Sequence, residues 1–210
     1  LRRRALPSAH THVFVHQGAP MQRFDLATIP STPWRNGGGA TRELACWPPG
    51  AGMDAFDWRV SVATVVQPGP FSAFPGIERH IMLLQGGALH LQARDGSLQH
   101  ALDTPWQPFC FPGEVAIDGT LAGGTSQDFN LMLRRGAWKG GIDIVRGSVQ
   151  PGVSPAGLCM VLEGTWASED AQGDAVFAPG QGLWWSASAP HASLAPRGTG
   201  TLAWLALSPV

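Results

Sequence analysis

Apolar and polar residues alternate along much of this chain with the period of two that β-strands require. In residues 59–63 the polar side chains of Arg59 and Ser61 fall on one face of such a strand, and two valines fall on the other. Strand-like runs of this kind lie at residues 41–46, 56–66, 81–84, 128–133 and 201–207. No amphipathic pattern of helical period is long enough to form a helix of several turns. The pattern therefore predicts an all-β fold.

Part of this pattern occurs twice. The run Ile-Met-Leu-Leu-Gln-Gly at residues 81–86 is echoed by Cys-Met-Val-Leu-Glu-Gly at residues 159–164, and a Pro-Gly pair and an apolar closing strand follow each copy. The repeat predicts two antiparallel β-barrel or jelly-roll halves, residues 21–138 and 139–210. We expect Gly86-Gly87 to end the strand of the first copy. Residues 1–20 are expected to be a flexible extension ahead of that fold.

Composition narrows the classes of function. Only 14% of the residues are charged, the net charge is −1 and there is no basic stripe, which argues against nucleic-acid binding. No apolar run approaches the roughly 20 residues that cross a bilayer, so no membrane partner is expected. The three cysteines, Cys46, Cys110 and Cys159, lie far apart in the chain and predict free thiols in a reducing cytoplasm.

Charged, polar and aromatic residues gather in residues 33–87 and predict a pocket in the first half. Three arginines are candidate anion anchors, because a guanidinium group binds a carboxylate through paired hydrogen bonds. Two glutamates are candidate acceptors, and aromatic rings could form the walls. The candidate ligand-binding residues are Trp34, Asn36, Arg42, Glu43, Arg59, Ser61, Phe71, Ser72, Phe74, Glu78, Arg79 and Asn130.

The same acids and arginines allow three interpretations. They bind a small ligand, they pair with one another in a structural network at the barrel mouth, or one acid serves as a general base. The spacing of these residues leaves all three open. No nucleophile elbow of the form GxSxG occurs, so no catalytic nucleophile is predicted.

Four motifs occur in order along the chain. They are WRNGGG at residues 34–39 with TRE at 41–43, FxWRxSxA at 56–63, GPFSxFPGIER at 69–79 and DFNLMxRR at 128–135. At this spacing they resemble the HutD/Ves family of small bacterial proteins, and the resemblance extends over about residues 21–208. The resemblance implies a bicupin-like architecture and a role in histidine utilisation. It also implies a small carboxylate ligand such as urocanate, formiminoglutamate or formylglutamate.

A metal ion or other cofactor is not predicted. Cupins often bind a metal through His-x-His-x-x-x-Glu, whereas this chain carries Ser72 and Phe74 ahead of Glu78. Neither hydroxyl nor phenyl side chains replace imidazole as metal ligands. The histidines at 80, 90 and 191 have no obvious third ligand nearby in the sequence.

The function predicted from these observations is binding of a small carboxylate by a cytoplasmic, metal-independent protein that acts in or regulates histidine utilisation. One alternative is a cofactor-free isomerase or hydrolase that uses Glu43 or Glu78 as its base. Another is a non-catalytic protein-interaction module. Because neighbouring strand residues face opposite sides, one of Trp184 and Trp185 is expected at the surface, where it could form a homodimer contact.

Overall fold

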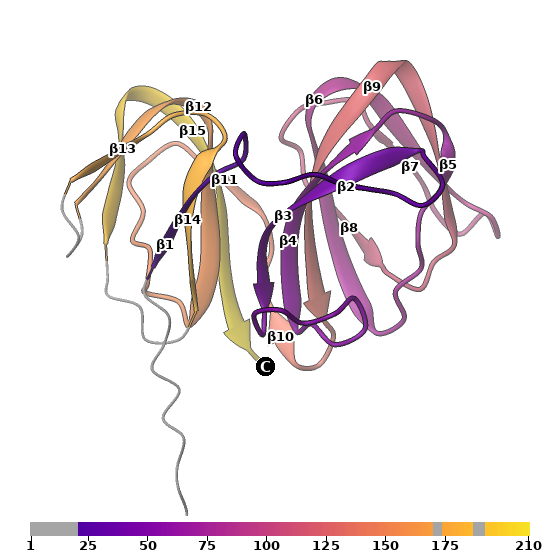
Figure 1. The fold of residues 1–210 in the computed structure, drawn as a ribbon, viewed down its shortest axis with the longest axis horizontal. Helices are drawn as coiled ribbons and strands as arrows, with labels where there is room; N and C mark the ends of the chain where they lie inside the picture. Colours follow the sequence, from indigo (N-terminus) through magenta and orange to yellow (C-terminus); the bar gives the residue numbers. More distant parts are fainter. Residues whose placement is uncertain (1–20, 170–173, 187–191) are drawn as a thin grey trace, which may run out of the picture.

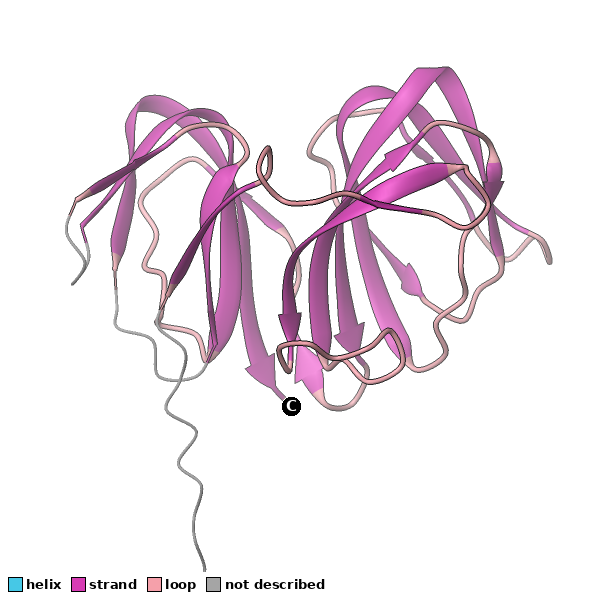
Figure 2. Cartoon of the chain, viewed as in Figure 1, coloured by secondary structure: helices cyan, strands magenta, loops and turns pink. Residues whose placement is uncertain are grey.

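The structure, a computed structural model, describes residues 21–169, 174–186 and 192–210, so the predicted extension at residues 1–20 and His191 lie outside the described residues. Within these ranges every regular element is a β-strand (Figure 2). The strands form two antiparallel sheets that lie side by side (Figure 1). The prediction of an all-β fold with two antiparallel, jelly-roll-like halves is confirmed. Among the described residues there is no helix long and apolar enough to cross a membrane.

The first sheet contains eight strands. They are β2 (Thr32–Pro33), β3 (Gly39–Trp47), β4 (Trp58–Val65), β5 (Gly69–Pro70), β6 (Ile77–Ala93), β7 (Gln99–Leu102), β8 (Phe109–Pro112) and β9 (Ile117–Arg134). Their order in space is β2-β3-β4-β9-β6-β7, with β5 beside β9 and β8 beside β6. Strands β4, β9 and β6 therefore form the centre of this half.

The second sheet contains seven strands. They are β1 (Gln22–Asp25), β10 (Trp138–Lys139), β11 (Asp143–Val145), β12 (Ala156–Glu169), β13 (Ala175–Phe177), β14 (Gln181–Ser186) and β15 (Ser193–Pro209). Their order is β1-β14-β12-β15-β10, with β11 beside β15 and β13 beside β12. Strand β1, whose residues the sequence assigned to the first half, is thus paired with β14 of the second sheet.

The repeated glycine bends its strand without ending it. Strand β6 continues through Gly86 and Gly87 and remains paired with β9, so the predicted end of the strand is wrong. Gly86 has φ +96°, and a Cβ atom there would collide with the carbonyl oxygen of Thr125. Gly164 in β12 has φ +77° and meets the carbonyl oxygen of Thr199 in the same way. In both halves glycine therefore permits a bulge where the paired strand approaches closely.

A shared apolar core lies between the two sheets. It is formed by alternate residues of β4 and β9 from the first sheet and of β12, β14 and β15 from the second. Trp58 and Trp184 meet edge to face across it, with ring centroids 6.2 Å apart. Because each sheet covers the other, both halves depend on this contact for burial of an apolar face.

The paired tryptophans of β14 are both buried. Trp184 faces the shared core and Trp185 faces the interior of the second half, where its ring lies 5.2 Å from that of Trp204. Their exposed fractions are only 9% and 1%. The two rings do point to opposite faces, but both faces are covered, so the expectation that one of them reaches the surface is wrong.

Candidate functional site

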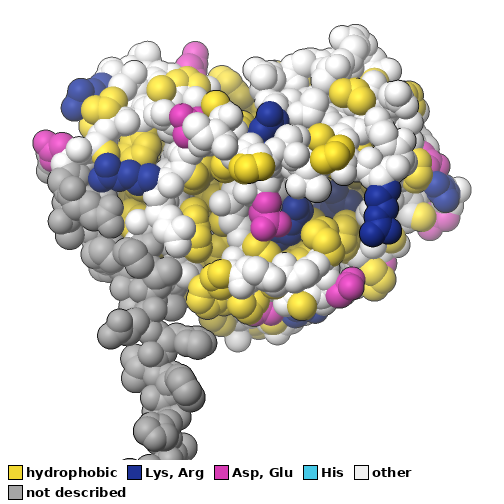
Figure 3. Space-filling model, viewed as in Figure 1, with side chains coloured by type: hydrophobic (Ala, Val, Ile, Leu, Met, Phe, Trp, Pro, Cys, Tyr) yellow, Lys and Arg dark blue, Asp and Glu magenta, His cyan; other side chains and the backbone are white. Residues whose placement is uncertain are grey.

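The polar face of β4 lines a pocket in the first half. Arg59, Ser61 and Ala63 border the pocket, whereas Val60 and Val62 belong to the shared core, as the alternation in the sequence predicted. The pocket has a volume of about 830 Å³. Figure 3 shows, on the face of this half, basic and acidic side chains lying among hydrophobic ones.

All but two of the candidate residues line this pocket. They come from the β2–β3 loop, from β3, β4, β6 and β9, and from the loop between β5 and β6. The lining candidates are Trp34, Asn36, Glu43, Arg59, Ser61, Phe71, Ser72, Phe74, Arg79 and Asn130. Residues far apart in the chain are thus brought to one cavity by the pairing of β3, β4, β9 and β6.

Arg79 is the most deeply buried basic group of the pocket, with 7% of the residue exposed. Its guanidinium carbon lies 5.1–5.7 Å from the ring centroids of Phe71, Phe74 and Phe111. One terminal nitrogen donates to the carbonyl oxygen of Ser72 at 3.3 Å, while Nε has no hydrogen-bond partner among the described residues. Burial lowers the pKa of Arg79 to about 10, so the group remains charged at neutral pH. A buried cation with an unsatisfied donor favours the binding of an anion.

Arg59 lies nearer the opening. Its Nε donates to Oε2 of Glu43 at 2.6 Å, and a terminal nitrogen donates to the hydroxyl oxygen of Ser61 at 3.2 Å. The Arg59 side chain is 12% exposed, whereas that of Glu43 is 48% exposed. Solvent therefore screens this ion pair and limits its contribution to stability. The pairing places one positive and one negative group at the same side of the pocket.

Asp128 of β9 lies behind this wall and is fully buried. Its Oδ1 accepts a hydrogen bond from the Ser126 hydroxyl at 3.1 Å, and its Oδ2 has no partner among the described residues. Burial raises the pKa of Asp128 to about 7, against the opposing effects of Ser126, the Arg79 charge and Asn130. Asp128 and Arg79 thus interact electrostatically, and the charge of each is disfavoured by burial.

The loop before β3 is fixed by its own polar groups. The indole nitrogen of Trp34 donates to the Thr41 hydroxyl at 2.8 Å, and Oδ1 of Asn36 accepts from the Gly38 amide at 3.0 Å. A Cβ atom on Gly39 would lie 2.9 Å from the Trp34 ring. The glycine therefore lets the indole ring, which lines the pocket, pack closely against the start of β3.

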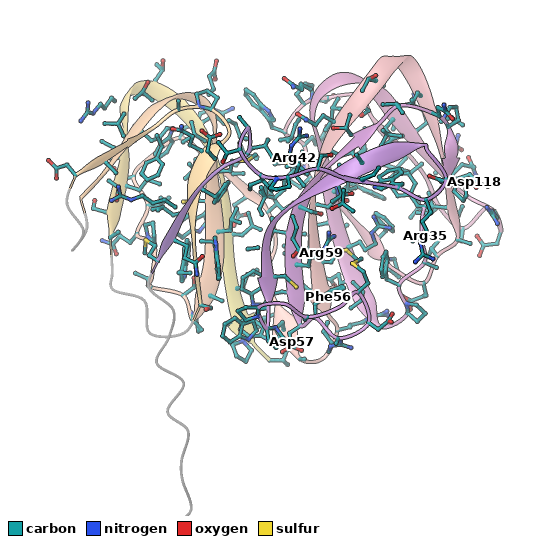
Figure 4. The ribbon with its side chains drawn as sticks, viewed as in Figure 1. Arg35, Arg42, Phe56, Asp57, Arg59 and Asp118 are labelled. Carbon is teal, nitrogen blue, oxygen red and sulfur yellow. The ribbon has the colours of Figure 1, made fainter. Side chains whose placement is uncertain are left out.

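Arg42 and Glu78 lie outside the pocket. Arg42 faces away from Glu43, and its Nε donates to the carbonyl oxygen of Ile29 at 3.1 Å in the segment that crosses between the halves. Figure 4 shows Arg42 near this crossing, apart from Arg59. Glu78 precedes Arg79 on β6 and faces the opposite side of the strand, where it contacts His80. In the structure neither side chain is part of the pocket wall.

Other lining residues were not among the candidates. Among them, Arg35 adds a third positive group near the opening, and Thr41, Met53 and Met132 contribute to the wall. Arg35 belongs to the WRNGGG motif, and Thr41 shares the face of Glu43 in the strand alternation, so the sequence carried a signal for both. Met53 comes from the loop between β3 and β4, and its position depends on that loop's path.

Comparison with known structures places the fold among cupins. A cupin 2 conserved barrel domain protein from Leptotrichia buccalis has a TM-score of 0.62 with 10% identity, covering 89% of this chain and 96% of that one. At that identity the similarity concerns the fold alone. Higher scores are found with a conserved protein of unknown function, PA5104, from Pseudomonas aeruginosa PAO1, at TM-score 0.79 and 27% identity. It covers 90% of this chain and 100% of the other.

Three further comparisons concern the family of the chain. A structure of HutD from Pseudomonas fluorescens SBW25 (formate condition) has a TM-score of 0.75 and 26% identity, covering 90% of this chain and 99% of that one. Protein Ves of Escherichia fergusonii is 40% identical over 166 residues, which is 79% of this chain and 83% of Ves. The HutD family model matches residues 26–204. As the four motifs predicted, the chain belongs to the HutD family.

Proposed function

We propose that this protein binds a small carboxylate in the pocket of its first half, and that it acts in or regulates histidine utilisation through that ligand. Arg79 binds the carboxylate at the inner end of the pocket, and Arg59 supplies a second cationic group nearer the opening. The compounds to test are urocanate, formiminoglutamate and formylglutamate. The free state of all three cysteines in the structure supports a reducing, cytoplasmic setting.

The state of Arg79 is the observation that carries this proposal. A guanidinium surrounded by three phenyl rings loses much of its hydration, and among the described residues its Nε has no partner and no carboxylate forms an ion pair with it. An incoming carboxylate would supply two acceptor oxygens to such a group. The phenyl and indole walls would pack against the apolar or ring portion of the ligand.

The dimensions of the pocket support a small ligand. Cavities of about 300–1,000 Å³ are typical of small-molecule sites, and this one has about 830 Å³. Membership of the HutD family supports the choice of pathway, since the matching relatives include HutD itself. The acid Glu43 is then placed to accept an N–H donor from the far end of the ligand while it pairs with Arg59.

The test is a thermal unfolding series on the full chain with each of the three carboxylates and with histidine as a comparison, followed by calorimetric titration. A ligand present at 100 times its dissociation constant stabilises the folded state by about 2.7 kcal/mol, which raises the midpoint by several degrees. We expect one of the carboxylates to do this, and we expect the shift to disappear in Arg79→Gln and to weaken in Arg59→Gln.

Arg94→Gln is the matched control, because Arg94 is an exposed arginine of the same half whose partner is Asp118. This variant should bind as tightly as the original protein. If no carboxylate raises the midpoint, or if Arg79→Gln responds like Arg94→Gln, the proposal fails and the arginines of the pocket are structural. Conversion of a carboxylate during the titration would instead identify the protein as an enzyme.

A further inference from the structure

Three residues with metal-binding side chains converge on the outer face of the first half. Nε2 of His80 lies 2.8 Å from Oε1 of Glu78 and 3.7 Å from Sγ of Cys110. The ligand atoms of all three lie within 4.8 Å of one another. This is the one group of at least three such residues found in the part of the chain that the structure describes.

The strand register explains why these residues meet. Glu78 and His80 are two apart on β6 and therefore share a face, and Cys110 on β8 is the direct partner of His80. Their neighbours Arg79 and Phe111 are also direct partners and point the other way, into the first half. The group is thus separated from the pocket by the thickness of the β6–β8 pair.

These contacts do not have the geometry of a catalytic cysteine activated by a histidine base. In a cysteine–histidine–acid triad the thiol and the acid contact different nitrogens of the imidazole ring. Here both approach the same atom, Nε2 of His80, so the acid cannot orient the ring toward the thiol.

We propose that Glu78, His80 and Cys110 form a binding site for a zinc-like divalent cation. A thiolate, a neutral imidazole and a carboxylate are a ligand set that zinc accepts, and the two negative ligands together balance its charge. Cys110 is exposed, and the Glu78 side chain is 42% exposed, so a cation can enter from solvent. With three protein ligands, the fourth position is left for water or another small ligand.

The spacing between the nitrogen and sulfur ligand atoms fits such an ion. Zinc bond lengths of about 2.3 Å to sulfur and 2.0–2.1 Å to nitrogen separate the two atoms by about 3.5 Å in a tetrahedral site. The observed distance between Nε2 of His80 and Sγ of Cys110 is 3.7 Å. Oε1 of Glu78 would move away from the ring nitrogen by about half an ångström, which its exposed side chain permits.

The decisive measurement is titration of the chelator-treated full chain with Co²⁺, followed by displacement with Zn²⁺. Binding of Co²⁺ by Cys110 gives a thiolate-to-metal charge-transfer absorption, which histidine or carboxylate sites elsewhere in the chain do not produce. We expect one equivalent to bind with this absorption, and Zn²⁺ to abolish it. In Cys110→Ser the absorption should vanish.

Two more variants separate this site from adventitious binding. His80→Gln and Glu78→Gln should weaken Co²⁺ binding by more than the roughly 10- to 100-fold that loss of an outer-shell partner costs. His90→Gln is the matched control, since His90 is an exposed histidine on the same strand, and it should leave binding unchanged. Absence of the charge-transfer band, or unchanged affinity in His80→Gln, would overturn the proposal. The exposure of Cys110 makes loss of folding in Cys110→Ser unexpected, and circular dichroism checks this.

Discussion

At the scale of single residues, two buried groups carry charges that are unfavourable in their surroundings: Arg79 in the pocket wall and Asp128 behind it. Burial lowers the pKa of Arg79 and raises that of Asp128, so each is less stable in its charged form than in water. Their mutual attraction offsets part of this cost. Because burial raises the pKa of Asp128 to about 7 while Arg79 stays charged, the net charge of these two groups that an anion meets depends on the protonation state of Asp128.

Asp128→Asn is expected to flatten the dependence of stability on pH. In the folded state Asp128 holds its proton up to about pH 7, whereas in the unfolded chain it loses the proton near pH 4. The folded state therefore binds more protons between these values, and stability falls as the pH rises through this window, by up to about 4 kcal/mol. Urea unfolding at pH 5 and pH 8 measures this slope.

Asp54→Asn is the control for this experiment, because Asp54 is an exposed aspartate of the same half. Its pH dependence should match that of the original protein. An unchanged slope in Asp128→Asn would show that Asp128 is already ionised at pH 5 in the folded protein.

Glu43→Gln separates binding from catalysis. If the pocket only binds a carboxylate, Gln keeps an acceptor oxygen for the N–H group of the ligand, so binding should change by no more than severalfold, with little loss of stability because the side chain is half exposed. If Glu43 is a general base, turnover should fall by about 10²–10⁴-fold while binding is retained. Calorimetric titration and a turnover assay of the same variant distinguish the two outcomes.

The alternation of side chains along a strand could predict which residues of one strand share the pocket face, but not which residues of different strands meet there. Arg59 and Ser61 share a face of β4, and both line the pocket. By the same rule Arg42 cannot share a face with Glu43, nor Glu78 with Arg79, so placing all four in one pocket conflicted with the alternation itself. The meeting of Cys110 with His80 depends on the register of β6 and β8, which no local pattern specifies.

At the scale of elements, the repeated glycine bulge is the feature that the two halves share most clearly. Strand β6 bends at Gly86 against β9, and β12 bends at Gly164 against β15. The sequence repeat marked both positions correctly, but it did not distinguish a strand end from a bulge, because glycine at positive φ occurs in each. Only the continued pairing beyond the glycine decides between them.

Gly86→Ala should destabilise the protein more than Gly96→Ala. Both glycines have positive φ, +96° and +76°, so alanine is strained at either position. At Gly86 the new Cβ would also collide with the Thr125 carbonyl oxygen, whereas at Gly96 no atom of the described residues lies within 4 Å. We expect a cost of about 1–2 kcal/mol for Gly96→Ala and more for Gly86→Ala, measured by urea unfolding. Equal losses would mean that the bulge relaxes without cost.

At the scale of the whole molecule, the two halves are joined by more than their sequence connection. Strand β1 pairs with β14 in the second sheet before the chain crosses to the first, and β10 and β11 return to pair with β15. The shared core between the sheets contains residues of both halves. The sequence repeat predicted two halves, but no pattern in the sequence indicated that the two sheets pack against each other. Apolar residues on both faces of a strand would indicate such packing, but they are also typical of a strand buried within one barrel.

Trp58→Ala tests whether this core makes the halves a single cooperative unit. Trp58 is fully buried and contacts both Trp138 and Trp184, so its truncation should cost about 3–5 kcal/mol. If the halves fold together, amide hydrogen exchange should accelerate by the same factor in β9 and in β12, because both open only by global unfolding. Acceleration confined to β9 would show that the second half is stable on its own. Val176→Ala, an exposed change in β13, should alter neither rate and controls for the substitution itself.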